Sequence, residues 1–116
     1  DRPATSSSSV ISLIRHDLGF DGLLLTDDLS MQALPGTMAE RAIASRTAGC
    51  DLLLHCNGDP REMEAVAEHG GPLDDAGRRR LSLALARLAE PEPVDIPAAI
   101  ARIDALLAKT AEANGP

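Results

Sequence analysis

Two short polar clusters, each directly after a run of three leucines, are the parts of this sequence that could carry chemistry. Thr-Asp-Asp stands at residues 26–28 and His-Cys-Asn at residues 55–57. Paired carboxylates such as Asp27 and Asp28 could attack a sugar or phosphoryl centre, bind a metal ion or transfer protons. Because successive side chains of an extended segment point in opposite directions, we expect one carboxylate to face a site and the other to anchor the following turn.

The second cluster carries weaker signals than the first. We interpret His55 as a hydrogen-bonded residue at the rim of the site, because it directly follows three leucines. Cys56 is interpreted as a small packing residue, because no neighbouring residue would activate its thiol. His16 and His69 lie in amphipathic or loop contexts, and we expect both to be solvated.

Two β-strands are predicted to position these clusters. The runs at residues 23–26 and 51–56 are short and apolar, which favours strands buried on both faces of a parallel sheet. Between them, Thr37 and Glu40 form a capping box that begins a helix, which should run to Gly49. A strand–helix–strand unit has parallel strands and a right-handed crossover, so both clusters should meet at one edge of the sheet.

A further helix is predicted on each side of this unit. The first follows a row of serine hydroxyls and ends at Gly19, and the second begins with Asp59 as cap, Pro60 in the first position and Glu62 completing a capping box. The residues expected to face the core are Val10, Leu13, Ile14 and Leu18 on the first helix and Met63, Val66 and Ala67 on the second. This alternation of helices and strands predicts an α/β fold.

The last third of the chain follows a different pattern. Gly-Gly-Pro at residues 70–72 interrupts the alternation, and two amphipathic helices follow, separated by Pro-Glu-Pro at residues 91–93. We therefore divide the chain into residues 1–72 and a helical tail, residues 73–116, that packs on the outside of the sheet. The apolar stripes of the two tail helices are Leu81, Ala84, Leu85 and Leu88, and Ile96, Ile100, Ile103 and Leu107.

Composition argues against several classes of partner. The net charge is −7, so neither nucleic acid nor an anionic membrane is expected as a partner. The only basic run, residues 78–80, is interpreted as a solvated helix start or as a group that pairs with Asp74 and Asp75. No apolar run approaches the roughly 20 residues that span a bilayer. Cys50 and Cys56 lack the spacing of a zinc or disulfide framework, which suits a reduced cytoplasmic protein without a metal or cofactor.

The segment at residues 18–31, LGFDGLLLTDDLSM, closely resembles the nucleophile segment of bacterial β-N-acetylhexosaminidases of glycoside hydrolase family 3. Further motifs resemble that family in the same order: Arg-Pro-Ala-Thr at 2–5, Ala-Glu-Arg at 39–41, Ala-Gly-Cys-Asp at 48–51 and His-Cys-Asn at 55–57. Because several separate motifs agree over residues 1–67, the resemblance is stronger than a single short pattern would make it.

The resemblance implies the C-terminal part of a (β/α)8 TIM barrel, with the two predicted strands as its seventh and eighth. It also implies a retaining glycosidase that releases terminal β-linked N-acetylglucosamine from muropeptide-derived sugars during peptidoglycan recycling in the cytoplasm. Asp27 matches the family's nucleophile, which attacks the anomeric carbon to form a covalent glycosyl-enzyme. Asp28 is then expected to support the site.

The sequence also departs from that family. The family's acid/base is a histidine paired with an aspartate in an upstream Lys-His-Phe-x-Gly-His-Gly-like motif, which this sequence lacks. His55 belongs to the strand-eight match and cannot take that role. A barrel of this kind needs about 250 residues and eight strands, so we expect this chain, which starts at Asp1 without an initiator Met, to be a fragment that is inactive alone.

Two other functions stay open from the residues. Asp27 and Asp28 could hold magnesium for phosphoryl transfer in a small α/β domain, although no phosphate-binding glycine loop or well-placed lysine accompanies them. The chain could instead be a non-catalytic remnant of a barrel that binds a partner.

Overall fold

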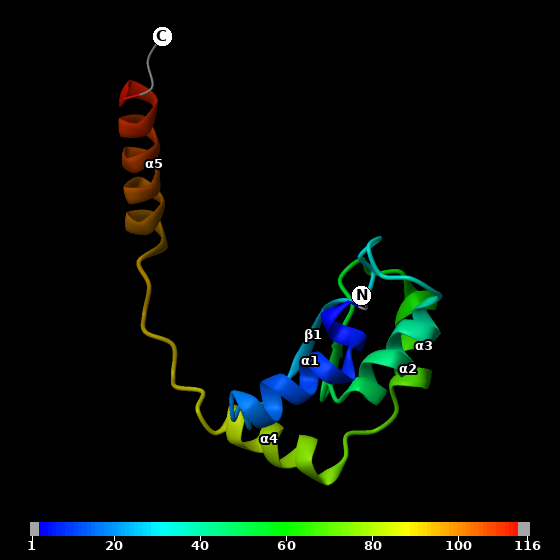
Figure 1. Cartoon of the computed structure of the whole chain (residues 1–116). Coiled ribbons are helices and arrows are strands. Elements are labelled where there is room, and N and C mark those ends of the chain that lie inside the picture. The colour runs from blue at the N-terminus through cyan, green and yellow to red at the C-terminus, as the bar shows by residue number, and fades with distance from the viewer. Residues whose placement is uncertain (1–2, 114–116) are drawn as a thin grey trace.

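A computed structural model describes residues 3–113 and confirms the α/β class (Figure 1). Arg2 of the predicted Arg-Pro-Ala-Thr match and the last three residues of the predicted tail lie outside the described residues. In chain order the elements are η1 (Ala4–Ser6), α1 (Ser8–Ser12), η2 (Leu13–Asp17), β1 (Leu25–Asp28), α2 (Met38–Ala48), β2 (Leu52–Leu54), α3 (Pro60–Gly70), α4 (Asp75–Leu85) and α5 (Ile96–Ala113).

The two strands form a parallel sheet, as predicted. Leu25 pairs with Leu52 and Asp28 with Leu54, with an irregularity between the two pairs. Strand β1 begins two residues later than predicted and contains both aspartates, and β2 is shorter than the predicted run. The predicted burial on both faces is wrong, since Leu25 is 48% exposed. The physical reason is that the sheet within the described residues consists of β1 and β2 alone, so both are edge strands.

Helix α2 begins and ends as predicted. Thr37 Oγ1 accepts a hydrogen bond from Glu40 N (3.3 Å), and the Glu40 carboxylate accepts one from Thr37 N (2.7 Å), which completes the capping box. Gly49 ends the helix with φ of 111°, a conformation that favours glycine. Ala42 and Ser45 are buried, and α2 packs against α3, η1, α1 and β2, so this helix provides the centre of the small core.

The first helical segment buries only part of the predicted face. Helix α1 continues into the π-helical turn η2, in which Leu18 N donates to Leu13 O over 3.0 Å. Ile11 is buried beside Gly49, whereas Leu18 is 71% exposed. Of the predicted stripe, Ile14 is half-buried, whereas Leu13 and Leu18 are exposed. A π turn holds an extra residue and rotates the side chains that follow, so the prediction is wrong at Leu18.

Helix α3 begins as predicted except at Glu62. Asp59 caps the helix by accepting from Arg61 N (2.9 Å), and Pro60 occupies the first turn. The carboxylate of Glu62 does not close a capping box, because it accepts hydrogen bonds from His55 and its neighbour Asn57 instead. Of the residues predicted to face the core, Val66 is half-buried, whereas Met63 and Ala67 are exposed. Within the described residues α3 packs chiefly on α2, so one side of it stays open.

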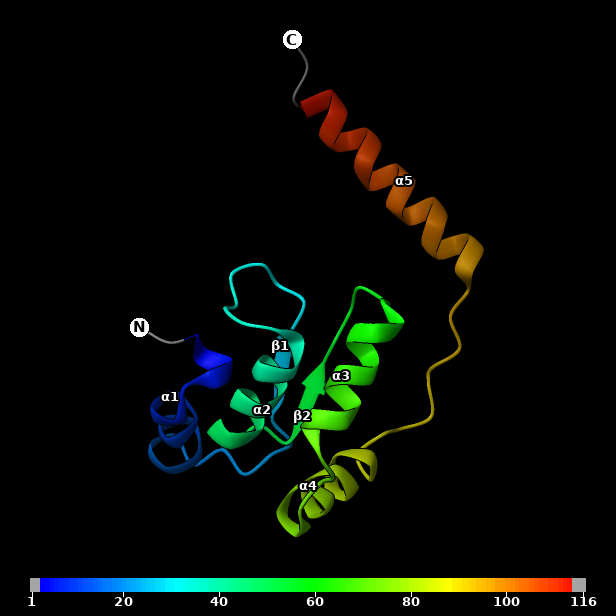
Figure 2. The same ribbon diagram turned by 90° about the vertical axis from the view of Figure 1, so that its right-hand side faces the viewer.

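The two tail helices lie in different places (Figures 1 and 2). Helix α4 lies next to the rest of the fold, with Leu81 and Ala84 half-buried, whereas an extended segment leads away to α5. Ile100 and Ile103 of α5 are more than half exposed. The predicted packing on the sheet is therefore wrong for α5, because the proline-containing segment carries it away. Neither α5 nor any other described helix is long and apolar enough to cross a membrane.

Candidate active site

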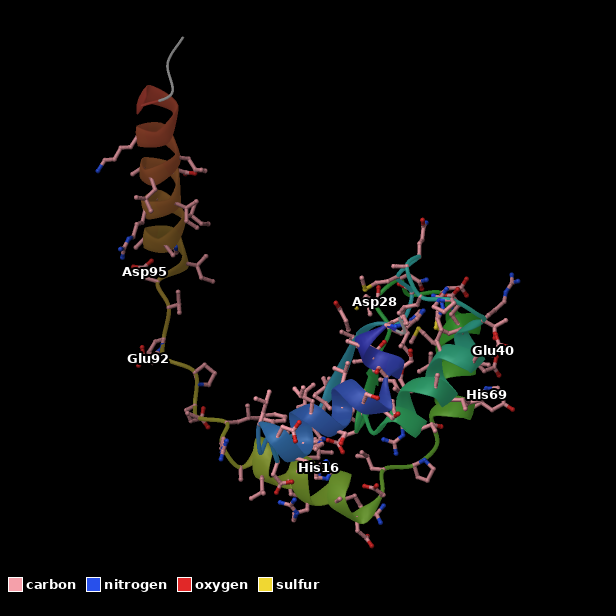
Figure 3. All side chains as sticks on the ribbon, viewed as in Figure 1. His16, Asp28, Glu40, His69, Glu92 and Asp95 are labelled. Atoms are coloured by element: carbon pink, nitrogen blue, oxygen red, sulfur yellow. The ribbon has the colours of Figure 1, made fainter. Side chains whose placement is uncertain are left out.

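The carboxyl ends of β1 and β2 bring the two predicted polar clusters together. The Asp28 carboxylate accepts hydrogen bonds from Cys56 N (3.0 Å), from Ser30 N (2.9 Å) and from the Ser30 hydroxyl. The Ser30 hydroxyl, followed by these backbone N–H groups, holds the pKa of Asp28 below its usual range. Figure 3 places Asp28 at the end of the molecule away from α4 and His16. The charged Asp28 therefore ties the loop after β1 to the chain that leaves β2.

Asp27 has different surroundings from its neighbour. Its side chain is exposed, and one of its oxygens accepts a hydrogen bond from Asp28 N over 2.8 Å. Asp27 lines a cavity of about 490 Å³. The rest of the cavity wall comprises Met31, Ala33 and Leu34 from the following loop and Pro3, Ala4 and Thr5 from the start of the described chain. The carboxylate of Asp27 thus borders a cavity, whereas the carboxylate of Asp28 accepts three hydrogen bonds.

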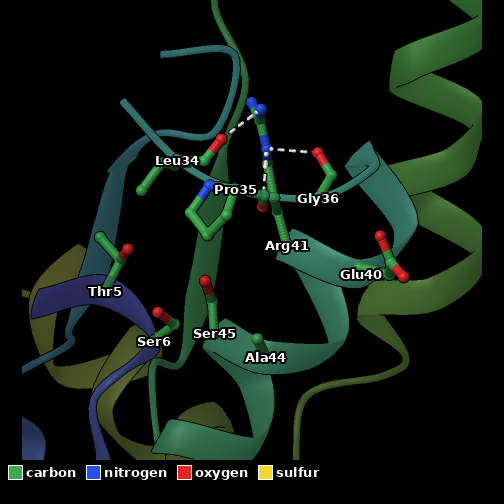
Figure 4. A pocket seen from close by; sticks show the side chains of 9 residues that line it. All are labelled: Thr5, Ser6, Leu34, Pro35, Gly36, Glu40, Arg41, Ala44 and Ser45. Atoms are coloured by element: carbon green, nitrogen blue, oxygen red, sulfur yellow. Dashed lines mark hydrogen bonds between the residues drawn. The ribbon is translucent and has the colours of Figure 1, made fainter. Parts of the chain in front are cut away.

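A second cavity of about 290 Å³ lies between η1, the loop after β1 and α2 (Figure 4). Thr5 and Leu34 line both cavities, so the two spaces share a wall. The Thr5 hydroxyl is buried and has no hydrogen-bond partner among residues 3–113. Arg41, on α2, reaches the backbone carbonyls of this loop and sets its shape.

His55 is hydrogen-bonded at the rim of this end of the sheet, as predicted. Its side chain is 6% exposed, and its Nε2 lies 2.9 Å from the Glu62 carboxylate, which also accepts from Asn57 Nδ2 at 2.6 Å. The hydrogen bond from His55 holds the pKa of Glu62 below its usual range, with Asn57 acting in the same direction. This cluster joins β2 to α3, and within the described chain His55 Nδ1 is buried without a partner.

Both cysteines are free thiols in different settings. Cys50 is buried, and burial raises the pKa of its thiol. Cys56 is exposed, so its predicted packing role is wrong; the chain leaves the sheet here, and the backbone N–H of Cys56 makes the structural contact. Among the side chains that the structure describes, no three of His, Cys, Asp or Glu lie close enough together to hold a metal ion. The magnesium alternative also lacks a free carboxylate at Asp28, since both of its oxygens accept hydrogen bonds.

The amino ends of the strands hold an ion network that the sequence analysis missed. Asp51 accepts hydrogen bonds from Arg15 (2.7 Å), Arg80 (2.9 Å) and Leu24 N (2.8 Å), and its side chain is 5% exposed. Burial alone would raise the pKa of Asp51, but these three donors outweigh burial and hold the pKa below its usual range. Asp51 therefore joins η2, the residue before β1, and α4.

The basic run on α4 only partly follows the prediction. Arg78 pairs with Asp75, whereas Asp74 accepts from a backbone N–H as the helix cap. The two arginines that follow reach Asp21 instead, over 2.7 and 3.0 Å. Asp21 precedes the apolar run that leads into β1, and Asp51 directly precedes β2 in the same way. An aspartate ahead of each strand run was the sequence signal that could have indicated the network.

Comparison with known proteins places this geometry in a family. Residues 1–88 match the glycosyl hydrolase family 3 N-terminal domain. A β-hexosaminidase of Photobacterium profundum is 38% identical over 69 residues, which cover 57% of this chain and 21% of that protein. A β-hexosaminidase of Alkalilimnicola ehrlichii is 39% identical over 82 residues, 68% of this chain and 23% of that protein.

A third relative, a β-hexosaminidase of Idiomarina loihiensis, is 47% identical over 47 residues, which cover 39% of this chain and 14% of that protein. The chain therefore spans less than a quarter of the length of each of these three relatives. The family match, in contrast, includes η1 through α4 and both polar clusters. Because it covers most of the chain, this protein belongs to glycosyl hydrolase family 3.

Proposed function

We propose that this chain is the part of a retaining β-N-acetylhexosaminidase that supplies the nucleophile, and that the nucleophile is Asp27. The observation that carries the proposal is the contrast between two adjacent carboxylates. Asp27 is exposed on a cavity at the carboxyl edge of the sheet, whereas Asp28 is held by three donors. Family membership and relatives named β-hexosaminidase support a glycosidase.

In this mechanism the Asp27 carboxylate attacks the anomeric carbon of the bound sugar. The bond from that carbon to the leaving oxygen breaks as the oxygen takes a proton from an acid that this sequence does not contain. The resulting glycosyl ester on Asp27 is then hydrolysed by water, which the same outside group activates as a base. Asp28 acts as a supporting residue, because its hydrogen bonds fix the backbone on both sides of the cavity edge.

The proposed architecture is the end of a (β/α)8 barrel, with β1 and β2 as strands seven and eight. Parallel pairing, a connecting helix and reactive groups at the carboxyl ends of the strands support it. The exposed Leu25 is also expected if further strands complete the sheet. The chain alone is then inactive. The domain boundary at residue 72 stays a prediction, and the family match extends past it to include α4.

The proposed substrate is a sugar with a terminal β-linked N-acetylglucosamine, such as those derived from muropeptides during peptidoglycan recycling in the cytoplasm. The nucleophile segment at residues 18–31, with its Asp-Asp-Leu-Ser-Met end, supports this choice. The relatives described above are named β-hexosaminidases, which also supports it.

The test is a hybrid enzyme in which residues 1–88 replace the corresponding segment of the Photobacterium profundum protein. Hydrolysis of a chromogenic N-acetylglucosaminide is measured for the hybrid and for its Asp27→Asn variant. Because loss of a nucleophile removes the covalent route, kcat should fall by roughly 10³-fold or more.

The matched control is Asp21→Asn, which makes the same chemical change on an exposed carboxylate at the other end of the sheet. This control should leave kcat unchanged. Activity of the Asp27→Asn hybrid close to that of the unmutated hybrid would contradict the assignment of the nucleophile.

A further inference from the structure

We propose that Arg41 is a positioning residue for the reaction at Asp27. Its guanidinium fixes the loop at residues 29–36, which forms one wall of the cavity beside the nucleophile. The inference rests on the proposed function of Asp27, but its structural part is testable without any catalytic assay.

Arg41 uses all three of its nitrogens on this single loop. Nη1 donates to Leu29 O (2.7 Å) and Met31 O (3.2 Å), and Nη2 donates to Leu34 O (2.5 Å). Nε lies 3.1 Å from Gly36 O and 3.4 Å from the carbonyl before it. Figure 4 shows dashed lines from the guanidinium to the carbonyls of Leu34 and Gly36, which lie on different sides of it. One planar group thus satisfies five carbonyl oxygens that have no strand or helix to pair with.

These contacts matter for the site because the other hydrogen bonds of the loop lie at its start, apart from one internal bond from Leu34 N to Met31 O (3.1 Å) and the cap of α2 that follows the loop. Leu29 is fully buried, and its N–H donates to Leu54 O (2.9 Å). The Asp28 carboxylate then holds Ser30. Beyond that point the loop lines the cavity of Asp27 with Met31, Ala33 and Leu34. The contacts of Arg41 therefore set where this wall stands relative to the nucleophile.

Arg46 offers a matched control on the same helix. It also donates its hydrogen bonds to backbone carbonyls, but these lie at the amino end of the strands, away from the cavity of Asp27. Its acceptors are Cys50 O (2.6 Å), Asp51 O (2.7 Å), Gly70 O (2.9 Å) and Pro72 O (3.0 Å). A lysine at either position keeps the positive charge but loses the planar fork that bridges several carbonyls.

The first experiment measures amide hydrogen exchange in the 116-residue chain. Two amides, Met31 N and Leu34 N, report on the loop, because each donates to a carbonyl within it or at its start. Arg41→Lys should speed their exchange by about tenfold or more, the factor expected for loss of a charge-assisted hydrogen bond. Exchange at Asp51 N, which donates to Leu24 O at the other end, should be unchanged. Arg46→Lys should speed exchange at Asp51 N and leave exchange at Met31 N and Leu34 N unchanged. Should Arg41→Lys unfold, Arg41→Gln serves as a second variant.

The second experiment measures steady-state kinetics in the hybrid enzyme described above. Because a misplaced cavity wall disturbs orientation more than binding, Arg41→Lys should lower kcat by about 10- to 100-fold with a smaller change in KM. Arg46→Lys should leave kcat unchanged.

Three results would overturn the inference. The first is unchanged amide exchange at Met31 N and Leu34 N in Arg41→Lys, and the second is faster exchange there with an unchanged kcat. The third is an equal loss of kcat in Arg41→Lys and Arg46→Lys. An inactive hybrid, or one that keeps its activity with Asp27→Asn, would contradict the proposed function instead. The exchange pattern would then decide the structural part of the inference alone.

Discussion

The two ends of the small sheet use carboxylates in opposite ways. At the amino end, Asp51 is buried and pairs with Arg15 and Arg80, which come from segments far apart in the sequence. At the carboxyl end, Asp27 is exposed on a cavity and Asp28 binds only neutral donors of the adjoining loop and strand end. Buried ion pairs hold the first end together, whereas the second is held by hydrogen bonds from neutral donors.

With Asp27 as the proposed nucleophile, this difference would separate stability from chemistry along the length of two short strands. A charge that is buried among arginines is costly to disturb, so the amino end should determine how firmly the unit folds. An exposed carboxylate beside a cavity is available to a ligand, and its removal should cost the fold little. In parallel α/β proteins, reactive groups typically lie at the carboxyl ends of the strands, and the proposed position of Asp27 agrees with that rule.

The largest stability effect should come from Asp51→Asn. The variant keeps an acceptor for Leu24 N but leaves Arg15 and Arg80 without the buried charge that they share. Removing one member of a buried ion network leaves its partners poorly compensated, so the free energy of unfolding should fall by about 3 kcal/mol. Urea denaturation of the 116-residue chain and its variant measures the difference.

The control for that prediction is Asp21→Asn. Asp21 also pairs with Arg80, but its side chain is largely exposed, so solvent screens the pair and the loss should be clearly smaller. If the two variants lost equal stability, burial would not distinguish Asp51 from Asp21, and the comparison of the two ends would fail.

Acid should weaken the amino end through the same carboxylate. The pKa of Asp51 is lower in the folded chain than the usual value of about 3.9 in the unfolded chain. A lowered pKa means that the stabilisation is fully present above about pH 3.9 and is lost as the pH falls through the folded value. The stability difference between the unmutated chain and Asp51→Asn should therefore stay constant at mildly acidic pH and shrink below that point. A difference that shrank already near neutral pH would show that another group controls it.

Local signals made part of this structure predictable. The capping box of Thr37 and Glu40, the cap at Asp59 and the stop at Gly49 each depend on residues close in sequence, and each was found where expected. The joining of the two polar clusters also followed from the parallel order of the strands.

Other features depended on distant residues, on an irregular turn or on competition for one side chain, and local spacing does not predict these. Asp51 and Arg80 are 29 positions apart, and no local pattern assigns them to each other. The exposed position of Leu18 follows a π turn that an α-helical period cannot represent. Glu62 had the spacing of a capping box, but His55 from another element competes for the same carboxylate. Sequence spacing therefore predicted local caps better than tertiary partners.

The smallest effect should come from removing α5. Its residues Ile100 and Ile103 are more than half exposed, and an extended segment separates it from α4. A chain that ends at residue 88 should therefore unfold with a free energy within about 0.5 kcal/mol of the complete chain, the range of surface changes. A chain that ends at residue 72 should lose much more, because it lacks Arg80 and leaves Asp51 with one of its two arginines. If the two truncated chains lost equal stability, the stabilising contacts would lie after residue 88. The expected contrast would instead show that α4 belongs with the amino end of the sheet rather than with the tail.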